Sequence, residues 1–273
     1  MTVDVTVDIT NPLGEKPHTA ARRYCIDRHA HWTARYAELT RGREHRVPYT
    51  YADRDRATFP RYQVLTAILL EIERLIPQES SVVELRDLLV CAAHTAETAF
   101  TKPPDAAISA KAMEEEREAF CAFVQTQDED LLWRVAPLPY RHVLSAAAAS
   151  VVGAELLRVW GARGYWYPLE RTRRTDVRAF RRDAFEADQA DAKVAALIDA
   201  LPARRLWQIG ETGLTFEIEP ASLDLLGAEE ETFWISADLD WIVYVSHESS
   251  VTVGGVLVDP LLAAWPGAAA AAW

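Results

Sequence analysis

The sequence predicts an α+β protein in which an N-terminal antiparallel helical bundle packs against a small C-terminal antiparallel β-sheet. Up to about residue 201, apolar residues recur with the period of a helix. Beyond it, short runs rich in Val, Ile and aromatic residues alternate and are separated by Gly or Asp turns. Helices followed by strands along the chain are typical of this class.

The helices are expected from apolar stripes and from residues that end or cap a helix. Leu65, Ile68 and Ile72 share one face, and Pro77 ends that helix. Ser80 or Ser81 is a suitable cap for the next one. Short connections marked by proline favour antiparallel neighbours. Helices are expected at 16–41, 61–76, 81–96, 106–135 and 140–160, with a further helical stretch to about 201.

The strands are expected at 206–209, 214–218, 233–236, 241–247 and 251–258. The fourth of these is apolar on both faces, which indicates a central strand. Residues 1–14 alternate weakly and are expected to form a short strand or an unpaired arm. The Ala-rich residues 268–272 are expected to fray.

A domain boundary near residue 202 divides the chain into a helical region, 1–201, and a β-rich region, 202–273. A sheet of about 70 residues buries little surface on its own. We therefore expect it to pack on the helices in one cooperative unit.

The charge of the chain restricts its partners. The net charge of −12 disfavours nucleic acid and anionic membrane surfaces and is compatible with a basic protein partner. Residues 22–61 hold ten Arg and five acids, so the rest of the chain carries −17. The apolar stretch 143–160 is interrupted by Ser, Glu and Arg, which predicts a buried helix and no membrane span.

Metal and cofactor sites are not expected. Three widely spaced cysteines without a CxxC indicate neither a disulfide framework nor a zinc site, which favours the reducing cytoplasm. His29 and His31 lie about 200° apart on the expected helix, so one metal cannot bind both. The glycine-rich phosphate loops, HExxH and GxSxG are absent.

Catalytic candidates lie at the C-terminal end of the expected strand 241–247. His247 is the candidate general base, with Glu248 or Asp240 as an acid or metal ligand. In one hypothesis, Asp238 and Asp240 lie near His247, point the same way and serve it; the favoured alternative is that both aspartates shape a turn and His247 caps a hydrogen-bond network. A triad made of Ser246, His247, Glu248 and Ser249 alone is excluded, because neighbours on a strand point to opposite faces.

Binding candidates combine arginine with aromatic residues. On a helix, the arginines at 171, 174, 178, 181 and 182 form one stripe that suits an anion, with Arg174 and Arg178 as its centre. The alternative is a solvated helix face. Tyr165, Trp166, Trp234, Asp238 and Trp241 are further candidates for ligand or partner binding, with core packing as the alternative for the indoles.

Three segments resemble large, uncharacterised bacterial proteins to which no activity is attached. They are Phe59-Pro60-Arg61-Tyr62, Gly164-Tyr165-Trp166-Tyr167-Pro168, and Trp234 to Trp241 continuing into Ser246-His247-Glu248-Ser249. The resemblance spans most of the chain and implies a whole-length unit.

Three functions follow as hypotheses. The first is a cytoplasmic, non-enzymatic protein that uses its acidic surface and the C-terminal sheet to hold a basic protein partner, as immunity-type or adaptor proteins do. The second is a hydrolase or phosphate-transfer enzyme with His247 as general base and an Arg-lined anion site. The third is RNA binding through residues 22–61, which the overall charge disfavours.

Overall fold

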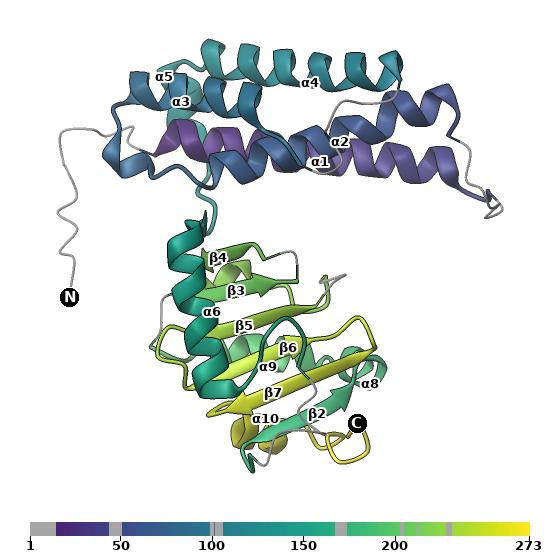
Figure 1. Ribbon diagram of the computed structural model, residues 1–273, viewed down its shortest axis with the longest axis vertical. Helices are drawn as coiled ribbons and strands as arrows, with labels where there is room; N and C mark the ends of the chain where they lie inside the picture. The colour runs from purple at the N-terminus through teal and green to yellow at the C-terminus, as the bar shows by residue number, and fades with distance from the viewer. Residues whose placement is uncertain are drawn as a thin grey trace. The chain divides into compact units, whose positions relative to one another are not determined.

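The structure is a computed structural model that describes residues 15–43, 51–98, 101, 106–166, 174–202, 205–211, 213–227 and 231–273. The α+β class is confirmed, with helices in the N-terminal half and a sheet in the C-terminal half (Figure 1). The chain forms two compact units, Met1–Leu138 and Pro139–Trp273. The expected arm at residues 1–14 lies outside the described residues.

The boundary between the units therefore differs from the one expected near residue 202. The sheet unit includes two strands and three described helices that precede residue 202 in the sequence. Each unit encloses a core of its own. Unfolding as one cooperative unit, with the bundle packed on the sheet, stays a prediction.

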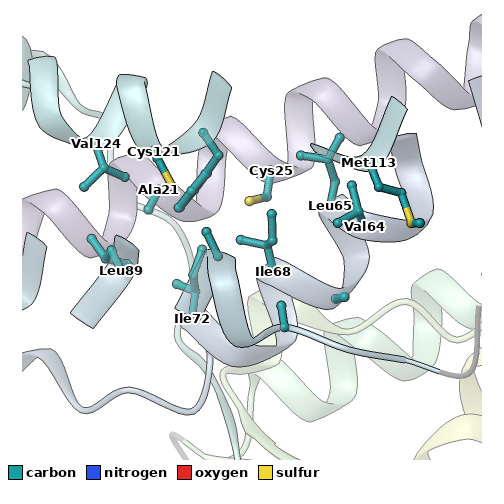
Figure 2. Packing of buried hydrophobic residues seen from close by; sticks show 14 of the residues in the cluster. Ala21, Cys25, Val64, Leu65, Ile68, Ile72, Leu89, Met113, Cys121 and Val124 are labelled. Carbon is teal, nitrogen blue, oxygen red and sulfur yellow. The ribbon is translucent and has the colours of Figure 1, made fainter. Parts of the chain in front are cut away.

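The helical unit contains α1 (Lys16–Thr40), α2 (Asp53–Ile72), η1 (Pro77–Glu79), α3 (Val82–Thr95), α4 (Ala107–Thr126) and α5 (Glu129–Arg134). Its core joins Cys25 of α1, Ile68 of α2, Leu89 of α3 and Val124 of α4 (Figure 2). Ser81 caps α3 as expected, because its hydroxyl accepts the Glu84 N–H while the Glu84 carboxylate accepts the Ser81 N–H.

Two helix boundaries in this unit differ from expectation. α2 begins eight residues before residue 61, because Asp55 and the Ala52 N–H form a capping interaction and Pro60 is accommodated within the helix. The single helix expected at 106–135 is two helices. Asp128 accepts the Leu131 N–H and so starts α5 with a new helical phase.

In its described residues, the sheet unit holds seven antiparallel strands in the order β1-β4-β3-β5-β6-β7-β2. Its strands are β1 (Arg141–Val143), β2 (Val177–Arg181), β3 (Leu206–Gly210), β4 (Thr215–Ile218), β5 (Thr232–Ser236), β6 (Trp241–Val245) and β7 (Ser250–Gly255). Its helical segments are α6 (Ala146–Trp160), α8 (Arg182–Ala187), α9 (Ala190–Asp199), η2 (Pro220–Ser222) and α10 (Val258–Ala264). The five expected strands are β3 to β7.

Helices cover both faces of this sheet (Figure 1). α6 packs Leu156 and Trp160 against Ile242 and Tyr244 on one face. On the other face, Phe185 of α8 lies against Phe180 of β2. All five residues of β6 are buried, and it is an interior strand of the sheet, as its two apolar faces predicted.

Two edge strands were not expected. β1 replaces the first turn of the helix expected at 140–160, and β2 replaces part of the helical stretch before 201. The C-terminal residues do not fray: the Trp273 N–H donates to the Ala179 carbonyl, and Ala271 is buried. This pairing covers the outer edge of β2, where unpaired backbone groups would otherwise be exposed.

Candidate functional site

The structure separates the predicted catalytic residues. Asp238 and Asp240 lie in the turn before β6, whereas His247 and Glu248 lie in the turn after it. Along an extended strand this separation is about 20 Å. Asp240 instead accepts the Ser236 hydroxyl, while its own N–H donates to Ser236 Oγ. The expectation that the two aspartates serve His247 is wrong, and the turn-shaping alternative is confirmed for Asp240.

A residue outside the prediction, Glu231, is the actual partner of His247. Thr232 pairs with Val245 in the β5–β6 ladder, so Glu231 faces Ser246 one position further out. The Ser246 hydroxyl donates to Glu231 Oε1 at 2.9 Å, and His247 Nδ1 lies 2.8 Å from the same oxygen. The antiparallel register is the signal that identifies Glu231, and it becomes readable only once the strand pairing is known.

The Glu231 carboxylate lies in an unfavourable environment. Its side chain is 5 % exposed, and Oε2 has no hydrogen-bond partner in the described part of the chain. Burial raises the pKa of Glu231, and the nearby Glu211 charge adds to the rise, while the Ser246 hydroxyl and His247 oppose it. A buried carboxylate with one unpaired oxygen destabilises the folded state.

Glu231→Gln is expected to stabilise the protein more at pH 7 than at pH 4.5. A folded-state pKa above the unfolded value means that the stability contributed by Glu231 is complete below the unfolded pKa and is lost as pH rises through the folded one. Glutamine does not ionise, so it avoids this loss. Urea denaturation of both proteins at the two pH values measures the change in free energy of unfolding. The same change at pH 7 and at pH 4.5 would contradict this expectation.

The turn does not form a serine nucleophile. Ser246 is buried, its hydroxyl donates to Glu231, and its oxygen accepts the Glu248 N–H. His247 is 56 % exposed at the side chain and contacts Glu231 through Nδ1. The arrangement is a histidine–carboxylate pair open to solvent. No group of three or more His, Cys, Asp or Glu among the described residues could hold a metal ion.

The arginine stripe expected on a helix is not formed. Arg178 and Arg181 lie on strand β2, and position 171 falls outside the described residues. Arg174 pairs with Asp176 through two bonds and lies 4.1 Å from the centre of the Trp160 ring. Arg178 donates to the carbonyls of Thr175 and Val177. Both guanidinium groups thus have local structural partners.

Three of the predicted binding aromatics fill the core. Trp234 and Trp241 are buried in β5 and β6, and Trp166 is buried against Trp160 and Tyr244. Strand alternation between two helix-covered faces leaves the indoles of Trp234 and Trp241 no access to solvent. Tyr165 and Asp238 are exposed, so among the binding candidates outside the arginines these two are accessible.

Four arginines of the segment 22–61, at positions 22, 28, 43 and 61, pair with buried acids of the helical unit. Glu116 of α4 is buried and accepts two bonds from Arg28, at 2.8 and 2.7 Å, and one from Arg61 at 2.9 Å. The Trp32 indole donates to it as well, at 3.1 Å. Arg22 pairs with buried Glu73. These arginines neutralise acids and are not arranged for RNA.

A different surface of the same unit is acidic and apolar. Residues 128–134 hold three acids, at 128, 129 and 130, against one base, Arg134, and all four are exposed. On α5, Leu132 is buried, while Leu131 and Trp133 are exposed, Trp133 by 56 %. Asp128, Glu129 and Asp130 precede them and are exposed. We call Asp128, Glu129, Asp130, Leu131 and Trp133 the α5 surface.

The sequence pattern did not indicate this surface. A continuous helix over 106–135 places Leu131 in the core. The break at Gln127 restarts the helix at Asp128, which turns Leu131 outward and Leu132 inward. The phase of a helix, and not its composition, therefore decides which leucine is accessible.

Comparison with family models, curated proteins and solved structures gave no match. Within the described residues, no helix has the length and apolar character needed to cross a membrane.

Proposed function

We propose that the protein binds a basic segment of another protein through the α5 surface. The observation that carries this proposal is the exposed Trp133 beside three exposed acids. Tryptophan is enriched among the residues that dominate binding energy at protein interfaces. Acidic neighbours attract a basic partner over a distance and select it against acidic ones.

The dispersal of the catalytic candidates supports binding over the enzyme built from His247, Asp240 and the arginines. Arg174 and Asp240 lie at the end of the sheet where β2 and β6 begin. His247 lies at the opposite end of β6. An anion held by Arg174 would therefore be about 20 Å from the imidazole.

Trp133→Ala is expected to weaken binding of a basic probe at least about tenfold, because the indole supplies the apolar anchor. The probe is a fluorescein-labelled amphipathic helix of Leu and Lys, measured by anisotropy with the full chain. Trp273→Ala is the matched control, since Trp273 is 54 % exposed but lies in the sheet unit. Equal weakening by both variants would overturn the proposal.

Charge is tested separately with Glu129→Lys combined with Asp130→Lys. Asp128 is kept because it caps α5. We expect this double variant not to bind the basic probe. Asp238→Lys, at an exposed turn of the sheet unit, is expected to bind it as the wild type does. Raising the salt concentration is expected to weaken binding, and the same helix with Glu in place of Lys is expected not to bind. Binding of the acidic helix would contradict the proposal.

A further inference from the structure

The contact between Glu231 and His247 fixes the imidazole tautomer. Oε1 of the buried carboxylate lies 2.8 Å from Nδ1, so the ring proton is held on Nδ1 and the lone pair is left on Nε2. Nε2 is on the side of the ring away from Glu231 and has no hydrogen-bond partner within the described residues. The side chain is 56 % exposed, so small molecules can reach this nitrogen.

The charge on Glu231 costs stability that the fold does not require. A glutamine of the same size accepts the same bonds from Ser246 and His247 without a buried charge. Groups that lower stability in this way concentrate at sites that perform chemistry. A carboxylate behind Nδ1 makes Nε2 more nucleophilic, because it stabilises the positive charge that develops on the ring.

The surroundings indicate which substrates can approach. The carboxylate of Glu211 acts on Glu231, and Glu248 lies on the same turn as His247. Two arginines also lie at this end of the sheet: Arg181 pairs with Asp183, and Arg182 donates its guanidinium to the Leu226 carbonyl and its backbone N–H to the Ser249 carbonyl. Negative charge therefore dominates around the imidazole and opposes the approach of anions.

We propose that His247 is a nucleophile toward small uncharged acyl donors, with Glu231 as its positioning residue. Nε2 attacks the carbonyl carbon, a C–N bond forms, and the bond from carbon to the leaving oxygen breaks with its electron pair on that oxygen. The Nδ1 proton passes to Glu231, which leaves a neutral acyl-imidazole. Glu231 gives this proton to the leaving oxygen, and water then hydrolyses the acyl-imidazole, which releases the acid and regenerates the histidine. This activity is independent of partner binding at the α5 surface.

Diethyl pyrocarbonate, an uncharged acyl donor, tests the proposal in the intact protein, with mass spectrometry of each histidine. His31 is the internal control, because it is exposed on α1, packs against Trp32 and forms no ion pair within the described residues. We expect His247 to be acylated roughly tenfold faster than His31. Glu231→Gln is expected to bring His247 down to the rate of His31 while leaving His31 unchanged, which loss of folding would not do.

The substrate class is tested with phosphoramidate, an anionic phosphoryl donor. His247 is expected to react no faster than His31 with this reagent, because Glu211 and Glu248 repel it. Equal acylation of the two histidines in the wild type, or an unchanged preference in Glu231→Gln, would overturn the proposal. Faster phosphorylation of His247 would overturn the assignment to uncharged donors.

Discussion

Replacing Glu116 by alanine is expected to destabilise the helical unit by about 3 kcal/mol. The change removes the acceptor of three guanidinium bonds and one indole bond at the centre of the α1–α2–α4 contact. Arg61 is largely buried and would be left with the Ala57 carbonyl and the partly exposed Glu115 as its partners. Arg28 is 35 % exposed, so water can solvate its charge once Glu116 is gone. The expected loss of stability is therefore at the lower end of the range for a broken buried ion pair.

Hydrogen exchange in the full chain measures this effect element by element. Protection of the α4 amides is expected to fall by about two orders of magnitude, which corresponds to 3 kcal/mol. Glu118→Ala is the matched control on the same helix, because Glu118 is exposed, and it is expected to change stability by no more than about 0.5 kcal/mol. Comparable losses in the two variants would show that Glu116 is not a structural centre.

Gly255→Ala is expected to destabilise the sheet unit by about 3 kcal/mol or more. Gly255 has φ +75°, a conformation that costs other residues about 1–2 kcal/mol. A Cβ there would also overlap the Asp240 carbonyl oxygen and lie 2.9 Å from its carbon. That carbonyl accepts the Val256 N–H, and the Gly255 N–H donates to Asp176, so the backbone has no room to move aside.

Thermal unfolding checks this prediction, with Gly153→Ala as the control. Gly153 lies in α6 with open space around its Cα, so alanine is expected to stabilise the helix by about 0.5–1 kcal/mol. The midpoint is expected to fall by roughly 10 °C for Gly255→Ala and to rise slightly for Gly153→Ala. An unfolding midpoint of Gly255→Ala equal to that of the wild type would contradict the packing described at this end of the sheet.

The sequence predicted the elements whose signals are local. Strands β3 to β7 alternate and are bounded by turn residues, and Ser81 begins α3 with its own capping partner three residues on. β1 and β2 are only three and five residues long, and they pair with distant β4 and β7. An arginine-rich segment such as 171–182 fits a helical wheel equally well, so periodicity alone assigned it wrongly.

The sequence predicted only the part of the site that has a local signal. His247 was identified because a histidine at the end of a strand is accessible. Its partner Glu231 is sixteen positions away in the chain and adjacent only through the β5–β6 register. Asp240 is nearer in sequence yet lies at the other end of the strand. The exposure of Leu131 was missed because it depends on the break between α4 and α5 at Gln127.

The central claim is that the α5 surface receives a basic partner. Hydrogen exchange of the full chain, with and without the Leu–Lys helix, tests it most directly. We expect added protection of α5 amides, at Leu131 to Arg134, and no change in β5, β6 or the turn at Asp238. Protection confined to the sheet unit, with α5 unchanged, would contradict the account.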